Sequence, residues 1–398
     1  MKYIKDNWFK TREFIYLSLL ALEIFLSLLF RTTFNMKTPL GYLLSSFQLF
    51  YIPVLVGVLY VADILMTGIR NNIKKVIIDG FIGVFFIIAA YTSLDFNLLA
   101  TGVFLVSSDK SSVKNIAKTI AVTLLFGTLL FGVFSQIGII DDRLTDRFGR
   151  IAHGFGFRRY AFPARQLLFV LCAYIGARVK KISWAELIVQ AGLIWLIYYY
   201  TTQRVTLIVF VAVWVLYIVT VKYEFIRINT KFVEFCSLTG FSVFGIFSVT
   251  VSYFYNESVW WMSKLNSFVN NRVVLGWEAF NRYDVNLFGQ EIVTDTIGEF
   301  GSFFYIDNGY LDVLFSYGLI LFIITTILYT VILWYSCRKN EKGLFIWMTA
   351  TMIYNFIDNA WLDMIATGVG VILFGAVLNE LRKEKAEKLK LPEKYLSE

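Results

Sequence analysis

The chain has 398 residues, of which 58% are hydrophobic and 17% are charged, and its formal net charge is +8. A soluble domain of this composition would expose a largely apolar surface, so the sequence indicates a membrane protein that crosses the bilayer several times. The basic residues lie in short segments between apolar runs, as in membrane proteins oriented by their charges. This pattern argues against a nucleic-acid-binding protein.

Apolar runs of about 20 residues cross a bilayer as helices, and somewhat shorter runs cross where the bilayer is thin. The sequence contains twelve such runs, which predict an all-α polytopic integral membrane protein with a single transmembrane domain over residues 1–398. The last two runs, separated by the segment DNAWLD, also allow a bent pair. The predicted spans are Phe14–Phe30, Leu43–Met66, Val76–Tyr91, Leu94–Ser107, Thr119–Gln136, Leu167–Ala177, Trp184–Tyr200, Val205–Val221, Phe232–Tyr255, Tyr310–Ser336, Leu344–Asn359 and Met364–Leu378.

The distribution of lysine and arginine predicts the orientation. With a cytoplasmic N-terminus, 25 of the 37 basic residues fall in inner segments, and every inner segment carries some of them. We therefore expect both termini in the cytoplasm, two large outer loops at 137–166 and 256–308, and a short charged cytoplasmic tail at 379–398. The inner loops are short and contain neither GxxxxGK[ST] nor GxGxxG, so we expect any group transfer to use a membrane-borne donor on the outer side.

Arginine is strongly preferred on the predicted outer side. It accounts for ten of the twelve outer basic residues but for only six of the 25 inner ones. A guanidinium group binds phosphate through two parallel hydrogen bonds, whereas the ammonium group of lysine is a movable point charge. The loop 137–166, with six arginines and no lysine, therefore suggests a phosphate site. The alternative is that these arginines contact lipid headgroups or pair with Asp141, Asp142 and Asp146.

The second outer loop, 256–308, supplies carboxylates to the same side of the membrane. Its periodicity predicts a surface helix over 265–280, and its acidic residues include Glu299 and Asp307. A site with arginines and a carboxylate would hold a diphosphate and accept a proton from a hydroxyl group.

Four groups of residues follow one another on the predicted outer side. They are Arg150 with Gly156, Phe157 and Pro163; Thr201, Thr202, Gln203 and Arg204; Asn271 and Arg272 with Leu287, Phe288 and Gly289; and Asp307, Asn308, Gly309, Tyr310, Leu311, Leu314, Tyr317 and Gly318. In this order along the chain, these motifs resemble those of bacterial Wzy-type polysaccharide polymerases, a group related to the O-antigen ligases. The chain differs at Ala164, where the family has Asn, and at Gln203, where it has Ser. Asp307 stands where ligases typically have His, which favours a polymerase.

The resemblance implies a metal-independent membrane glycosyltransferase of the bacterial plasma membrane, without a cofactor and with its active site facing outward. It would transfer a growing glycan from undecaprenyl diphosphate to a hydroxyl of the next lipid-linked repeat unit. Flippase and chain-length regulator proteins are the implied protein partners, besides membrane lipids. Asp307, with Glu299 as substitute, would be the catalytic base. The diphosphate-binding residues would be Arg150, Arg204 and Arg272, together with Arg159 and Arg165.

Other interpretations of the same residues remain open. The protein could instead be a flippase or transporter of lipid-linked oligosaccharides, or a ligase that passes the finished glycan to another acceptor. Arg204 at a helix end could extend to lipid headgroups, and Arg272 could pair with Glu278 or Asp284. Asp307, together with the following Asn308, could simply cap a helix.

Overall fold

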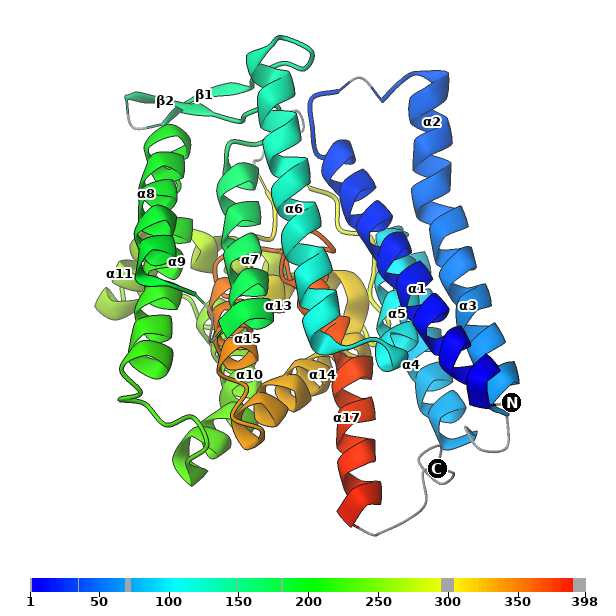
Figure 1. Ribbon diagram of the computed structural model, residues 1–398. Coiled ribbons are helices and arrows are strands. Elements are labelled where there is room, and N and C mark those ends of the chain that lie inside the picture. Colours follow the sequence, from blue (N-terminus) through cyan, green and yellow to red (C-terminus); the bar gives the residue numbers. More distant parts are fainter. Residues whose placement is uncertain are drawn as a thin grey trace.

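The computed structural model describes residues 2–34, 36–68, 73–147, 149–179, 182–294 and 304–388. Helices dominate these residues (Figure 1), because a helix satisfies its own backbone hydrogen bonds where lipid offers none. The α-helices that precede the β-hairpin of residues 144–153 are α1 (Lys2–Phe30), α2 (Pro39–Ser46), α3 (Ile52–Thr67), α4 (Ile73–Ser93), α5 (Asn97–Ser107) and α6 (Val113–Gln136). The later helices are α7 (Ala161–Arg178), α8 (Trp184–Thr201), α9 (Arg204–Tyr217), α10 (Lys231–Tyr253), α11 (Trp260–Phe268), α12 (Arg272–Arg282), α13 (Gly309–Asp312), α14 (Gly318–Arg338), α15 (Lys342–Tyr354), α16 (Gly368–Val371) and α17 (Leu373–Lys388).

Within the described residues, seven helical segments are long and apolar enough to span a membrane. They coincide with seven of the twelve predicted spans, and they support the predicted class, a helical membrane protein. The remaining predicted spans correspond to α5, α7, α8, α15 and the α16–α17 pair, which are shorter or less apolar. The seven segments are Trp8–Phe30, Pro39–Thr67, Ile73–Ser93, Val113–Gln136, Arg204–Lys222, Lys231–Tyr253 and Gly309–Arg338.

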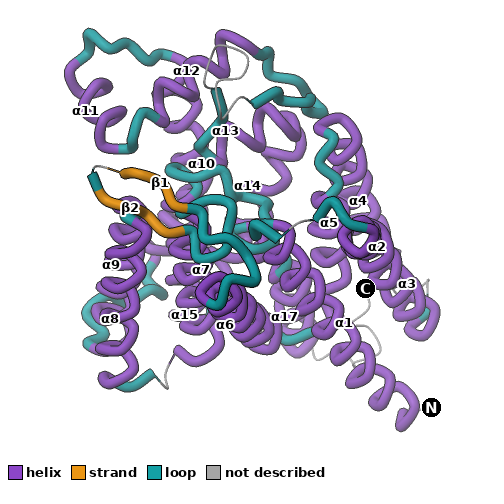
Figure 2. The backbone as a smooth tube through the Cα atoms, turned by 90° about the horizontal axis from the view of Figure 1, so that it is seen from above, coloured by secondary structure: helices purple, strands orange, loops and turns teal. Residues whose placement is uncertain are grey.

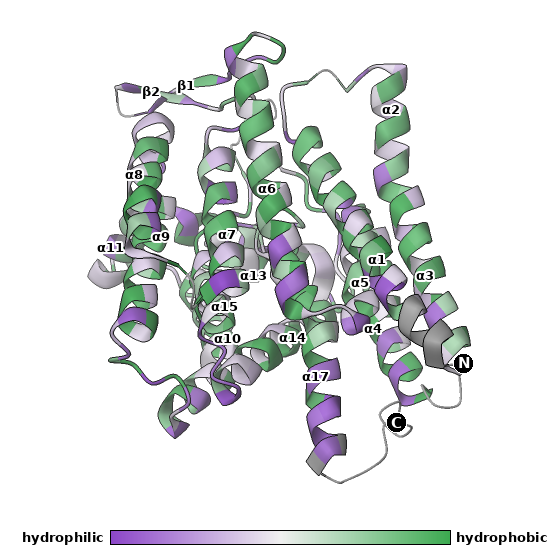
Figure 3. Cartoon of the chain, in the orientation of Figure 1, coloured by the Kyte–Doolittle hydropathy of each residue, from purple (hydrophilic) through white to green (hydrophobic). Residues whose placement is uncertain are grey.

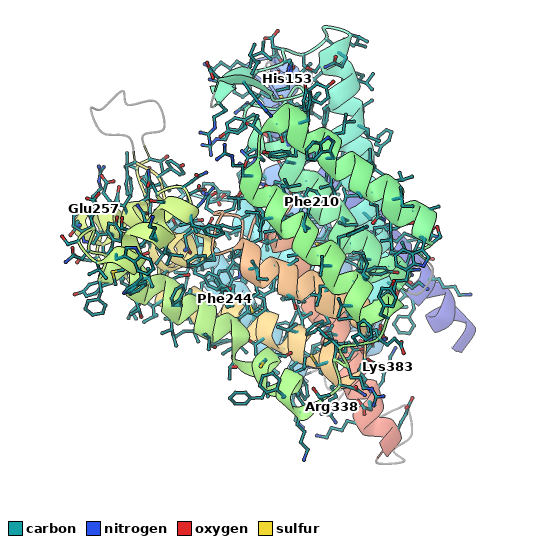
Figure 4. The ribbon with its side chains drawn as sticks, turned by 90° about the vertical axis from the view of Figure 1, so that its left-hand side faces the viewer. His153, Phe210, Phe244, Glu257, Arg338 and Lys383 are labelled. Carbon is teal, nitrogen blue, oxygen red and sulfur yellow. The ribbon has the colours of Figure 1, made fainter. Side chains whose placement is uncertain are left out.

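The two ends of the helical bundle carry different parts of the chain. The start of α1 and the end of α17 lie at the same end, where the last turns of α17 are strongly polar (Figure 3). Arg338 and Lys383 lie toward this end, whereas His153 lies at the opposite end (Figure 4). His153 belongs to an antiparallel hairpin of β1 (Leu144–Arg147) and β2 (Arg150–His153), which covers the top of α8.

The predicted loop 256–308 differs from the prediction in its helices. In place of one helix over 265–280, it contains α11 and α12, which lie to one side of the bundle (Figure 2). The break occurs at Asn270 and Asn271, whose φ angles of 56° and 63° are left-handed and end the helix. The Asn266 side chain stabilises this break by donating to the Asn271 side chain and accepting from the backbone N–H of Val274.

Between α15 and α16 the chain is irregular over residues 355–367, although it runs through the interior of the protein. Such backbone is tolerated at this depth only where protein groups satisfy its polar atoms. The N–H of Gly309 donates to the carbonyl of Asn355 at 2.7 Å, and the Tyr329 hydroxyl lies 2.8 Å from the carbonyls of both Trp361 and Thr367. The bent pair that the sequence allowed around DNAWLD is therefore an irregular segment held by α13 and α14.

The segment around Gly289 contacts the start of α14 at Gly318. Gly289 and Gly318 have φ angles of +87° and +89°, and a Cβ atom on Gly318 would lie 2.3 Å from the backbone nitrogen of Gly289. The N–H groups of Leu319 and Ile320 also donate to the carbonyls of Asn286 and Leu287. This close backbone contact anchors the end of the loop 256–294 to the start of α14.

Two acids inside the predicted spans face the protein interior, as we expect for charges at membrane depth. Asp63 and Asp79 are 1% and 9% exposed. Asp79 accepts a hydrogen bond from Tyr60 and lies 3.8 Å from Lys75. Lys75 in turn pairs with Asp109 at 2.7 Å, so the charge of Asp79 is compensated where α3 and α4 meet the turn that follows α5.

We predict that Gly318→Ala destabilises the protein by about 1–3 kcal/mol, because alanine is strained at this φ and its Cβ would overlap the Gly289 backbone. Thermal unfolding of the detergent-solubilised protein measures the effect. Gly132→Ala is the matched control, since its Cβ meets no atom within 4 Å and it lies within α6. Equal melting temperatures for the two variants would contradict the proposed role of the glycine contact.

Candidate functional site

Asp307 is placed by the cap of the helix that follows it. The side chain of Asn308 accepts hydrogen bonds from the N–H groups of Tyr310 and Leu311 and so caps α13. Its amide nitrogen donates to the carbonyl of Phe356 at 3.2 Å, which joins this cap to the irregular segment. Because Asn308 performs the capping, the carboxylate of Asp307 is available for another partner.

That partner is Arg272, at the N-terminus of α12. The Arg272 Nη2 atom lies 2.7 Å from Oδ2 of Asp307, and its Nη1 donates to the carbonyl of Val269 at 3.0 Å. The side chains of this ion pair are only 13% and 14% exposed. The alternative pairing of Arg272 with Glu278 is wrong, because Glu278 pairs with Arg282.

A second arginine connects α7 to the irregular segment. Arg165 is 3% exposed, and its two terminal nitrogens lie 3.3 Å from Oδ1 of Asp358 and 3.0 Å from Oδ2 of Asp363. Asp363 also pairs with Arg31 at 3.3 Å, at the end of α1. The ring of Phe162 lies beneath both guanidinium groups, 5.5 Å from that of Arg31 and 4.7 Å from that of Arg165.

The two sets of ion pairs interact electrostatically and form one site, which we call the arginine–carboxylate cluster. The charge of Asp358 acts to raise the pKa values of both Asp307 and Arg272, and the charge of Arg165 acts to lower the pKa of Asp307. The charge of Arg159, an exposed residue, acts to lower the pKa values of Asp307 and Tyr305. The cluster consists of Arg31, Arg159, Arg165, Arg272, Asp307, Asp358 and Asp363.

Asp307 and Asp363 of the cluster differ in protonation behaviour. Burial raises the pKa of Asp307 to about 6, although Arg272 acts to lower it. Burial would also raise the pKa of Asp363, but Arg31 and Arg165 together hold that pKa below its ordinary value. Asp363 is therefore a fixed negative charge, whereas Asp307 is poised to exchange a proton near neutral pH.

Two of the predicted diphosphate ligands, Arg150 and Arg204, are exposed and lie outside the arginine–carboxylate cluster. Arg150 is exposed at the hairpin turn, directly opposite Arg147 in the strand register, so the two side chains share a face. The guanidinium of Arg147 lies 5.2 Å from the ring of Tyr160, next to Arg159.

The other predicted ligand outside the cluster, Arg204, is exposed at the first position of α9. Thr206 of the same helix hydrogen-bonds to Tyr354, whose hydroxyl lies 2.9 Å from Oδ2 of Asp358. The start of α9 is therefore close to the cluster. The substitute base, Glu299, lies outside the described residues.

The sequence-based prediction included Asp307, Arg159, Arg165 and Arg272 but missed Arg31, Asp358 and Asp363. The available signal was the pair of acids in DNAWLD, between two apolar runs. Ionisable residues at membrane depth commonly mark a functional site and require partners. Comparisons with protein-family models, with curated proteins and with solved structures find no match to this chain.

We predict that Arg165→Met destabilises the protein by about 3–5 kcal/mol, because it removes the guanidinium that pairs with Asp358 and one of the two that pair with Asp363. Arg178→Met is the control, since Arg178 is 47% exposed and pairs with Glu186, an arrangement worth about 0–1 kcal/mol. Thermal unfolding in detergent compares the variants. A melting temperature for Arg165→Met within error of the control would show that the buried pairs do not stabilise the fold.

Proposed function

We propose that this protein is a Wzy-type polysaccharide polymerase that joins lipid-linked repeat units on the outer face of a bacterial plasma membrane. The observation that supports this proposal best is the arginine–carboxylate cluster. It brings four guanidinium groups together with three carboxylates. We infer that the hairpin end of the bundle is extracytoplasmic and that both termini are cytoplasmic.

The donor would be a growing glycan on undecaprenyl diphosphate. Within the described residues, the Nε atoms of Arg165 and Arg272 are buried without a hydrogen-bond partner. Buried donors are normally satisfied, so an oxygen-rich anion is a suitable ligand for them. Arg31 and Arg159 are accessible at the margin and would bind further phosphate oxygens, with Arg150 and Arg204 at the periphery.

Arg165 already uses both terminal nitrogens on Asp358 and Asp363, so its main role would be to hold these acids in position. Arg272 would turn from Asp307 toward the diphosphate when the donor binds. Each charge-assisted contact to phosphate contributes about 1.5–3 kcal/mol. The same contacts would stabilise the charge that develops on the leaving diphosphate.

In the proposed reaction, the bond between the anomeric carbon and the diphosphate oxygen breaks as the acceptor oxygen bonds to that carbon. The acceptor hydroxyl transfers its proton to Asp307, which returns it to solvent, and undecaprenyl diphosphate leaves. Burial raises the pKa of Asp307 to about 6, which suits a base that works near neutral pH. Flippase and chain-length regulator proteins would act before and alongside this step.

We predict that Arg272→Lys abolishes most polymerisation although the protein inserts normally, because lysine keeps the charge and loses the bidentate geometry. Gel analysis of lipid-linked glycans from cells that carry only the variant measures the effect. Single repeat units on the outer membrane face are expected. Single repeats retained inside the cell would instead indicate a flippase, and long unattached chains a ligase. Lys264→Arg is a control on the exposed face of α11.

We predict that the polymerisation rate falls as the pH decreases through about 6, because only the ionised form of Asp307 accepts a proton. The measurement is a rate–pH profile of membranes supplied with a lipid-linked repeat unit. Asp307→Asn should show less than about 1% of the wild-type rate, in line with the contribution of general-base catalysis. An unchanged profile in Asp307→Asn would remove Asp307 from the catalytic role.

A further inference from the structure

A pocket of about 140 Å³ lies beside the arginine–carboxylate cluster and has the opposite charge. Its polar lining comes from the end of α13, from the helical turn between α13 and α14, and from residues near the end of α4 and in two irregular segments. None of these lining residues is arginine or lysine. The residues that matter here are Asp95, Asp312, Ser316, Tyr317 and Asn359, with Ile306 as an apolar wall.

The pocket and the cluster share their walls. Burial alternates along the segment 304–308, because residues 304, 306 and 308 are buried and residues 305 and 307 are half-buried. Ile306 lines the pocket, while its neighbour Asp307 pairs with Arg272. In the irregular segment, Asn359 likewise lines the pocket, while its neighbour Asp358 pairs with Arg165. A ligand in the pocket would therefore lie next to the proposed catalytic carboxylate.

Hydrogen bonds hold the pocket's two acids in place. The Tyr317 hydroxyl donates to Oδ2 of Asp95 at 2.8 Å, and the Ser316 hydroxyl donates to Oδ1 of Asp312 at 3.0 Å. The backbone N–H of Gln290 donates to the carbonyl of Ser316 and so holds this residue of the pocket wall in position. The pocket is thus already formed, and its acids present oxygen acceptors to whatever enters.

We propose that this pocket binds one neutral sugar ring of the acceptor repeat unit. Its volume is comparable to an engineered cavity of about 150 Å³ that holds a six-membered ring. Carboxylate, amide and hydroxyl groups hydrogen-bond to sugar hydroxyls, whereas the Asp95 carboxylate repels phosphate. The charges would therefore direct the acceptor sugar to the pocket and the donor diphosphate to the arginines. This inference rests on the proposed function for the identity of the ligand as an acceptor.

Saturation-transfer NMR of the detergent-solubilised protein tests the pocket without requiring polymerisation. The probes are free glucose, N-acetylglucosamine and glucuronate. We expect the wild-type protein to bind a neutral sugar and to exclude glucuronate. Asp312→Asn and Tyr317→Phe should weaken neutral-sugar binding about tenfold, and Asp95→Asn should admit glucuronate. Asp284→Asn, which changes an exposed acid outside the pocket, should bind sugar as the wild type does.

The outcomes separate the two proposals. Sugar binding that depends on Asp312 and Tyr317, in a protein that forms no polymer, would support the pocket and reject the polymerase. Polymerisation at the wild-type rate in both pocket variants, with unchanged sugar binding, would overturn the pocket and leave the polymerase standing. Absence of neutral-sugar binding to the wild-type protein would also overturn the pocket.

Discussion

The buried ion pairs of Arg165 determine how the rest of the site is assembled. A guanidinium with 3% exposure needs compensating charge, and the carboxylates that supply it come from the irregular segment 355–367. These pairs bind α7 to a stretch of backbone that is not itself helical. Asp358 is thereby brought within electrostatic reach of Arg272 and Asp307, which approach from the other large outer segment. Four separate parts of the chain thus meet around one set of charges.

Backbone contacts complete this assembly. Gly309 and Gly318 allow the irregular segment and the loop 256–294 to approach α13 and α14 more closely than a side chain would permit. One consequence is that arginines gather on one side of the segment 304–308 and acids line the pocket on the other. This separation of charge suits a protein that must accept an anionic lipid carrier and a neutral sugar at adjacent positions.

Local sequence patterns predicted the features that depend on local physics. Apolar run length predicted the membrane class and seven of the strongest helices, and the preference for arginine on the outer side included Arg165 and Arg272. The break at Asn270 was missed, because the 3.6-residue periodicity continues across it while the left-handed backbone does not.

The ion-pair partners could not be predicted, because they are far apart in the sequence. Asp363 lies 198 residues from Arg165 and 332 residues from Arg31. No spacing rule connects such positions, and the polar DNAWLD segment could equally have been a simple turn between two helices. Only the folded chain shows that its acids face inward.

The central claim is that guanidinium groups of the cluster bind a diphosphate. The most direct test is the dissociation constant of farnesyl diphosphate for the detergent-solubilised protein, compared between the wild type, Arg272→Lys and Arg159→Lys. The account predicts tighter binding of the diphosphate than of farnesyl monophosphate, and about a tenfold or greater loss of diphosphate affinity in Arg272→Lys. Equal diphosphate affinity in all three proteins would contradict it.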